Sequence, residues 1–311
     1  MEYARRRNRR RRRRSGGSEG GGAGRAVIAL LMVGAIVYLI SASSAGEWIA
    51  QKVIAPVIEA FSGEKDADGA EDVNTDNPDT EAPANTSEVS LSTEKNAVSA
   101  EVTLPAVTCY MLQMGSFSTE ENALAQATLL KTMGGGGYVM LDGDRYRVLA
   151  GGYTTKETAE EVRDRLKNDG VDCMVYPFTT ASASFRVTAA EDRLESVKSG
   201  FQALANAQNT LSATSMRYDA STGDVDEGKA ACAEIASTLK TGMEVLSGYA
   251  DSDSEVLKKL LACYDTYENE LNALAESNAE TLVAFSAQIK YTQLYLTHEY
   301  FKLMEAFSSV A

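Results

Sequence analysis

The side chains that most often perform chemistry are scarce in this chain. His298 is the only histidine, and no two of the four cysteines have Cys-x-x-Cys spacing. The usual zinc-ligand spacings are therefore missing, and we expect neither a metal nor another cofactor. Hydrolases also need paired carboxylates or a nucleophile beside its base, and no such clustered motif occurs. The sequence predicts that the protein is not an enzyme, that His298 is a packed residue, and that the thiols are free: Cys109, Cys173, Cys232 and Cys263.

The polar residues that could instead bind a ligand lie in a segment that repeats after 36 residues. Residues 110–119 align with residues 146–155, and the match continues as far as Val139 and Val175. In each copy, alternating side chains predict a strand, a capping box begins a helix, and a glycine ends it. The two capping boxes and the two closing glycines are Ser118 with Glu121, Thr154 with Glu157, Gly134 and Gly170.

Two strand-helix-strand units in tandem predict a ferredoxin-like β-α-β-β-α-β fold with both helices on one face of the sheet. The other face is expected to be bare. Because side chains alternate along a strand, Gln113 should point away from Leu112. In the same way, Arg145 and Arg147 should lie opposite Val148. The bare face is therefore the candidate binding surface. The alternative is that Gln113 is only an exposed surface amide and that Arg147 is only a solvated charge at the sheet edge.

Two short motifs, QMGSF at Gln113–Phe117 and YRVLAGGY at Tyr146–Tyr153, give residues 104–180 a resemblance to the SPOR (sporulation-related) domain family. The resemblance implies binding to peptidoglycan glycan strands stripped of their stem peptides, without bond-breaking chemistry. Such an uncharged sugar polymer is held by planar donors and acceptors and by apolar faces rather than by charge. Arg145 stands where relatives often have an aromatic residue. The expected glycan-binding residues are Gln113, Ser116, Arg145, Arg147 and Val175.

The amino-terminal part predicts a membrane anchor. Residues 1–25 hold ten arginines and two glutamates, a net charge of +8. Because the whole chain has a net charge of −14, the remaining residues carry a net charge of −22. Residues 26–45 approach the ~20 apolar residues of a transmembrane helix, although a cleaved signal peptide is the alternative. The preceding arginines place the amino terminus in the cytoplasm and the body outside. The arginine block could also bind anionic lipid or nucleic acid, but orientation alone explains it, and the acidic body argues against a nucleic-acid partner.

Two further segments follow the anchor. Residues 46–61 have apolar side chains at helical spacing and predict a juxtamembrane amphipathic helix. Residues 62–103 are rich in acidic and small polar residues and predict a disordered linker that gives the body reach. An anchor followed by a linker is also the usual arrangement of division and sporulation proteins that carry the domain.

Residues 184–311 predict an antiparallel bundle of three or four helices. The expected helix starts are Thr188, Asp224, Ser252 and Ser277. The last helix has two adjoining apolar stripes, one through Phe285, Ile289 and Leu296 and one through Tyr291, Leu294 and Phe301. These stripes are either buried within the bundle or form a surface for envelope or division proteins or for self-association. The runner-up function is therefore an oligomerising membrane scaffold that does not bind glycan.

Overall fold

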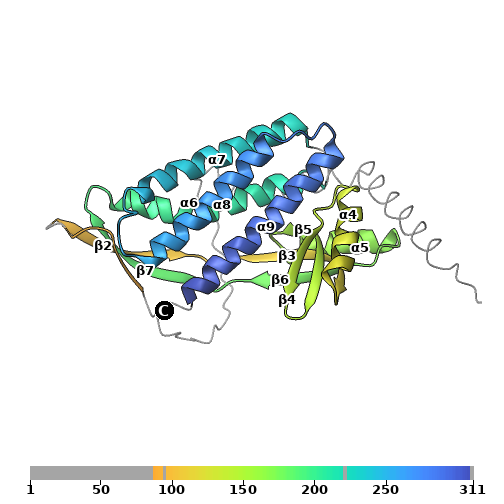
Figure 1. Cartoon of the computed structure of the whole chain (residues 1–311), viewed down its shortest axis with the longest axis horizontal. Helices are drawn as coiled ribbons and strands as arrows, with labels where there is room; N and C mark the ends of the chain where they lie inside the picture. The colour runs from red at the N-terminus through yellow and green to blue at the C-terminus, as the bar shows by residue number, and fades with distance from the viewer. Residues whose placement is uncertain (1–86, 94–95, 220–222, 309–311) are drawn as a thin grey trace, which may run out of the picture.

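The computed structural model describes residues 87–93, 96–219 and 223–308 of the chain (Figure 1). The predicted cytoplasmic tip at 1–25, membrane span at 26–45 and juxtamembrane helix at 46–61 lie outside these residues. Within the described ranges, none of the helices is long and apolar enough to cross a membrane. The described part combines two β-sheets with a bundle of long helices, an α+β architecture.

The repeated segment folds as a four-stranded antiparallel sheet in the order β4-β5-β3-β6. This order and the two intervening helices confirm the predicted ferredoxin-like β-α-β-β-α-β fold. Leu112 packs against one helix and Val148 against the other, and both residues lie on the same face of the sheet. The elements are β3 (Thr108–Phe117), α4 (Glu120–Lys131), β4 (Tyr138–Asp142), β5 (Arg145–Tyr153), α5 (Lys156–Asn168) and β6 (Met174–Thr179).

The ends of α4 and α5 follow from local chemistry, with small shifts from the predicted caps. The N-cap of α5 is Thr155, whose side chain accepts a hydrogen bond from the Thr158 amide, one residue later than expected. The N-cap of α4 is Thr119, which makes no side-chain cap hydrogen bond. Gly134 and Gly170 follow the two helices with φ of 83°, a conformation that favours glycine, as their predicted closing role requires.

A second, three-stranded sheet was not predicted. It has the order β1-β7-β2 and is formed by β1 (Ser87–Ser90), β2 (Ala97–Leu104) and β7 (Ala183–Ala190). Strands β1 and β2 lie in the stretch predicted as disordered linker, and β7 contains the predicted helix start Thr188, so both predictions are wrong there. These strands are folded rather than disordered because their alternating apolar residues are buried in the core beneath the helices. The buried residues are Val89, Val102, Leu104, Phe185, Val187 and Ala189.

The two sheets are joined by a continuous antiparallel ribbon. Strand β2 leads into β3 while β6 leads into β7, and both pairs keep their antiparallel pairing. Between them, the Thr180 amide donates to the Val107 carbonyl and the Val107 amide donates to the Thr180 hydroxyl, both at 2.9 Å. The repeated domain is therefore connected to the rest of the body by paired strands.

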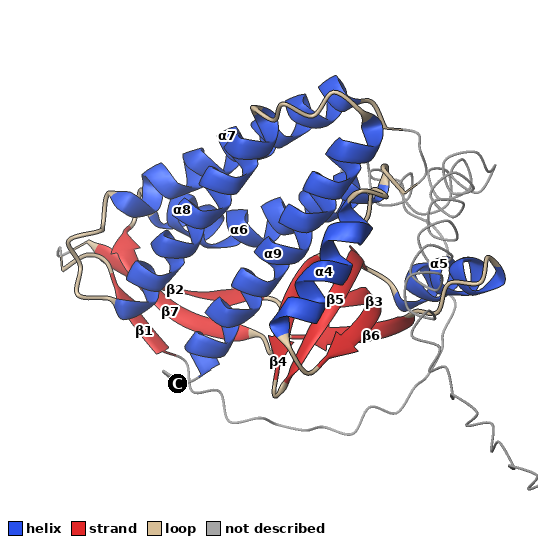
Figure 2. Cartoon of the chain, turned by 45° about the vertical axis from the view of Figure 1, so that its right-hand side comes forward, coloured by secondary structure: helices blue, strands red, loops and turns tan. Residues whose placement is uncertain are grey.

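Four helices form the bundle, as predicted, and Figure 2 shows them lying over both sheets. Asp224 caps its helix as expected. The next cap is Ser254 rather than Ser252, and the last helix begins after Thr281 rather than at Ser277. The helices are α6 (Leu194–Met216), α7 (Val225–Ser247), α8 (Glu255–Ala275) and α9 (Leu282–Ser308).

The two apolar stripes of α9 serve two different interfaces. Phe285, Ile289 and Leu296 lie in the core of the bundle. Leu294 and Phe301 pack instead on the face of the four-stranded sheet that α4 and α5 leave free. The expectation that this face is bare is therefore wrong, because part of it is covered by the chain's own last helix.

Candidate functional site

The free face of the four-stranded sheet has two parts, which we name by what lies over them. The covered half contacts α9. Within it, the Phe178 ring stacks on the Phe301 ring with centroids 4.0 Å apart, and the Tyr138 hydroxyl lies 2.7 Å from His298 Nδ1. Burial lowers the pKa of His298, and the nearby Lys302 ammonium lowers it further. The remaining sheet residues of the covered half are Cys109, Met111, Met140 and Leu149.

Close approach of α9 to the sheet depends on a glycine. A Cβ atom at Gly152 would lie 2.8 Å from Cys109 Sγ and 2.9 Å from the side-chain amide of Gln293 on α9. Nearby, Lys290 Nζ lies 2.6 Å from Asp219 Oδ1 and donates to the Gly134 carbonyl at 3.2 Å. The Tyr153 hydroxyl donates to the other oxygen of Asp219 at 2.8 Å. These buried polar contacts tie the repeated domain to the bundle.

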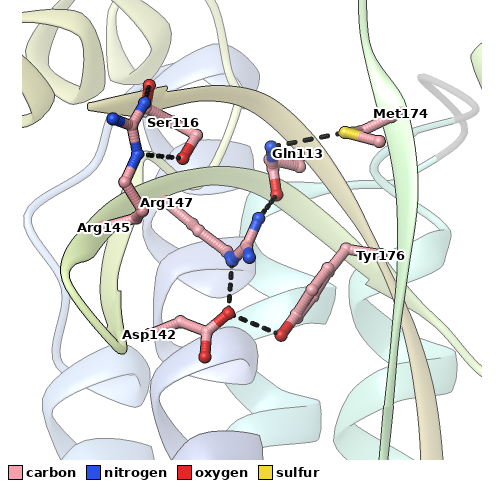
Figure 3. Close-up of polar contacts among 7 residues, drawn as sticks. All are labelled: Gln113, Ser116, Asp142, Arg145, Arg147, Met174 and Tyr176. Atoms are coloured by element: carbon pink, nitrogen blue, oxygen red, sulfur yellow. Dashed lines mark hydrogen bonds and ion pairs between the residues drawn. The ribbon is translucent and has the colours of Figure 1, made fainter. Parts of the chain in front are cut away.

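The open half consists of the polar ends of the same strands, and Figure 3 shows its contacts. Arg147 lies at the centre. Its Nε donates to Asp142 Oδ2 at 2.6 Å, its Nη1 donates to Gln113 Oε1 at 2.7 Å, and its guanidinium lies 4.4 Å from the centre of the Tyr176 ring. The Tyr176 hydroxyl donates to the same Asp142 oxygen at 2.9 Å, and the Gln113 amide donates to Met174 Sδ at 3.4 Å.

A second arginine lies beside this network (Figure 3). Arg145 Nε donates to Ser116 Oγ at 3.2 Å, and its Nη2 donates to the Ser116 carbonyl at 2.6 Å. Arg145 and Ser116 are exposed and half-buried, respectively. The guanidinium is thus fixed at the surface by one neighbouring residue.

An irregularity in β3 brings Gln113 and Ser116 onto one face. Strict alternation would put these two residues on opposite faces, because they are three positions apart. The pairing with β5 shifts near Met114, so that Gln113 faces Leu149 while Ser116 faces Arg147. The tight turn between β4 and β5, where Gly143 has a φ of 60°, then sets Asp142 opposite Arg145.

Comparison with protein families now assigns this sheet. Residues 107–177 match the family model of the SPOR domain. This part of the chain is a SPOR domain. The SPOR family consists of binding domains, generally for peptidoglycan in division proteins. No curated protein and no solved structure matches the chain.

The SPOR domain brings together four of the five expected glycan-binding residues. Gln113, Ser116, Arg145 and Arg147 all lie in the open half. Gln113 is only 5% exposed, so the alternative of an exposed surface amide does not hold for it. The prediction is wrong for Val175, which pairs with Leu112 and packs on the α5 side of the sheet, away from the open half.

Three members of the site were missed by the sequence reasoning. Asp142 and Tyr176 hold Arg147, and Met174 is 53% exposed next to Gln113. The alternation of β6 carried a signal for Met174 and Tyr176, because these residues are two apart and must share a face. For Asp142 the signal was its position just before the turn glycine Gly143, directly ahead of the two arginines.

The electrostatics of the open half follow from this geometry. Hydrogen bonds from Arg147 and then from Tyr176 hold the pKa of Asp142 below its usual value. Burial and the hydrogen bond to the Asp142 carboxylate raise the pKa of Tyr176. Asp142 and Arg147 neutralise one another, which leaves Arg145 as the cation of the site. Among the described residues, no group of three or more potential ligand side chains could hold a metal ion.

Proposed function

We propose that the chain is a membrane-anchored protein of the cell envelope that binds peptidoglycan glycan strands stripped of their stem peptides. Residues 26–45 are its single membrane span, with the amino terminus in the cytoplasm and the SPOR domain outside. It acts at the septum during cell division or sporulation. The observation that carries the proposal is the meeting of Gln113, Ser116, Arg145 and Arg147 in the open half of a SPOR sheet.

The chemistry of the open half suits a sugar polymer. The guanidinium groups, the Tyr176 ring and the exposed Met174 side chain offer donors and apolar faces to a sugar, and the buried Gln113 amide holds Arg147 in place. The covered half is closed to a ligand as long as α9 lies on it, so we place the glycan on the open half alone. The bundle then serves to hold the SPOR domain in a fixed orientation.

The alternative function, an oligomerising membrane scaffold that does not bind glycan, has less support. It rested on the second apolar stripe of α9 as a surface for self-association, and that stripe is occupied by the SPOR sheet of the same chain. Partners of the bundle among envelope or division proteins remain part of the proposal only through its other surfaces.

Pelleting of the full chain with purified glycan tests the proposal. The wild-type chain should sediment with amidase-treated glycan and much less with glycan that keeps its peptides. Arg147→Lys should bind several-fold more weakly, because an ammonium keeps the charge but cannot reproduce the planar contacts to Asp142, Gln113 and Tyr176.

The matched control is Arg186→Lys, at an exposed arginine of β7 outside the SPOR domain. This variant should bind like wild type. Equal sedimentation of the wild-type chain with both glycans, or with neither, would reject the proposed function.

A further inference from the structure

The two arginines of the open half differ in how their charge is met. Arg147 forms an ion pair with Asp142 and lies over the Tyr176 ring. Arg145 is hydrogen-bonded to Ser116, an uncharged residue. Although Asp142 faces Arg145 across the strand pair, its Oδ2 oxygen accepts from Arg147 and Tyr176 instead. In the described part of the chain, no carboxylate forms an ion pair with Arg145.

The Arg145 side chain is also held in place before any ligand arrives. A guanidinium has five N–H donors, and Ser116 receives two of those of Arg145. The other three are left for a ligand. Because two contacts already restrict this long side chain, binding an anion there costs less conformational entropy than it would at a freely rotating arginine.

A lone cation is significant on this protein because the formal net charge of the chain is −14. Such a body repels anions, so an anionic ligand needs an uncompensated positive group at the point of contact. Fixed guanidinium groups recognise carboxylates by charge-assisted hydrogen bonds, the stronger class of hydrogen bond.

The proposed ligand supplies a carboxylate at a defined place. The sugar rings of the glycan are uncharged, but the stem peptide is joined through an amide to a carboxyl group on every second sugar. Hydrolysis of that amide releases the peptide and leaves a carboxylate on the sugar. A stripped strand therefore carries a regular row of carboxylates close to its rings, at positions where an intact strand carries peptide.

We propose that Arg145 is the carboxylate subsite of the SPOR sheet, and that it binds the carboxylate that removal of the stem peptide leaves on the sugar. This inference rests on the proposed function. Ser116 is the positioning residue for Arg145, and the buried Gln113 is a positioning residue for Arg147. Arg147 and Tyr176 contact the sugar rings. The site thereby recognises the chemical product of peptide removal, in addition to the absence of the peptide's bulk.

The test varies Arg145 of the protein and the carboxylates of the glycan independently. Amidase-treated glycan is compared with the same glycan after carbodiimide coupling of methylamine, which turns each carboxylate into a neutral amide. Full-length wild type should lose roughly tenfold in affinity when the carboxylates are blocked, the scale of one charged hydrogen-bonded contact. Arg145→Gln should bind both glycans equally, at the level of wild type on the blocked glycan.

Two further variants complete the design. Arg186→Gln removes one positive charge from β7 and should keep the tenfold discrimination, which separates the subsite from general electrostatics. Arg145→Lys keeps the charge without the fork of donors and should keep part of the discrimination. Circular dichroism of each variant should match wild type, because Arg145 is exposed.

The outcomes separate the two proposals. Wild type that binds blocked and unblocked glycan equally well overturns the carboxylate subsite but leaves the proposed function standing. A folded Arg145→Gln chain that still discriminates between the glycans, or that binds neither, also overturns it. Wild type that binds neither glycan removes the proposed function itself.

Discussion

The covered and open halves belong to one face of one sheet, yet they are satisfied in opposite ways. In the covered half, Met111 and Leu149 contact apolar side chains of α9. In the open half, Gln113 and Arg147 bond to each other and to polar neighbours on adjacent strands. Each strand changes along its length: β5, for example, has Leu149 in the covered half and Arg147 and Arg145 in the open half.

The composition along a strand, and not the face alone, determines what a sheet surface contacts. Apolar area removed from water contributes about 25 cal/mol per Å², so an apolar strand end needs a cover. Polar groups without partners cost free energy when buried, so the polar ends of the same strands stay at the surface or bond to one another. Helix α9 lies over the apolar part of the sheet and leaves the polar part open.

Disruption of the covered half should have the largest effect on the stability of the protein. Phe301 is 6% exposed and stacks on Phe178, so Phe301→Ala should lower the free energy of unfolding by about 3–5 kcal/mol. Urea denaturation of the full chain measures the change. Leu124→Ala is the matched control, because Leu124 is 50% exposed on α4, and its cost should stay within about 0.5 kcal/mol. A Phe301→Ala chain as stable as the control would mean that α9 does not depend on this contact.

Much of the SPOR fold was predictable from local patterns. The 36-residue repeat gave the order of strands and helices, and alternation put Gln113 and Arg147 on the face opposite Leu112 and Val148. The three-stranded sheet was not predictable in this way. Its strands β1 and β2 are far from β7 in sequence, since Leu104 pairs with Ala183 and β1 lies farther away still. Without β7 as a partner, their short alternating runs resemble a polar linker.

The candidate site was predictable for four residues and not for the rest. Ser116 was found through the family motif, whereas the pairing shift that carries it to the Gln113 face leaves no signal in the residue types. The docking of α9 could not be derived either, because helical periodicity gives the two stripes but not their partners. One usable signal was overlooked: the outward residues of β3, β4 and β5 are apolar in one half and polar in the other, which already argued against a wholly bare face.

A smaller effect is expected at the polar contacts between the SPOR domain and the bundle. Lys290 and Asp219 have side chains only 11% and 15% exposed, so Lys290→Met leaves a buried carboxylate without its cation. We expect a loss of roughly 2–3 kcal/mol, below the full cost of breaking a buried pair because the Tyr153 hydroxyl still donates to Asp219.

The double variant Lys290→Met with Asp219→Asn serves as the control for this pair. It should recover part of the loss, because a neutral amide costs less to bury than a carboxylate. Urea denaturation of the single variant Lys290→Met and of the double variant measures the difference, and a double variant no more stable than Lys290→Met alone would contradict the assignment.

The smallest expected effect is a pH dependence that distinguishes the two halves. His298 lies in the covered half, and burial lowers its pKa from 6.5. Between the lowered folded pKa and 6.5, the unfolded chain binds more protons than the folded chain, so stability rises with pH in that window. The contribution is fully present above pH 6.5 and is lost as the pH falls through the folded pKa. The Asp142 carboxyl of the open half has its pKa shifted below 3.8 by Arg147 and does not titrate in this range.

His298→Asn isolates this contribution, since an asparagine side chain can hydrogen-bond the Tyr138 hydroxyl in place of Nδ1 but does not titrate. The difference in unfolding free energy between wild type and variant should be constant above pH ~7 and should shift against wild type as the pH falls below ~6.5. Three charged groups act on the imidazole: Lys302 lowers its pKa further, while Glu299 and Glu305 oppose the shift, which keeps the effect small. A difference that stays constant down to pH ~5 would mean that His298 is as well solvated in the folded chain as in the unfolded one, and that α9 does not seal the covered half.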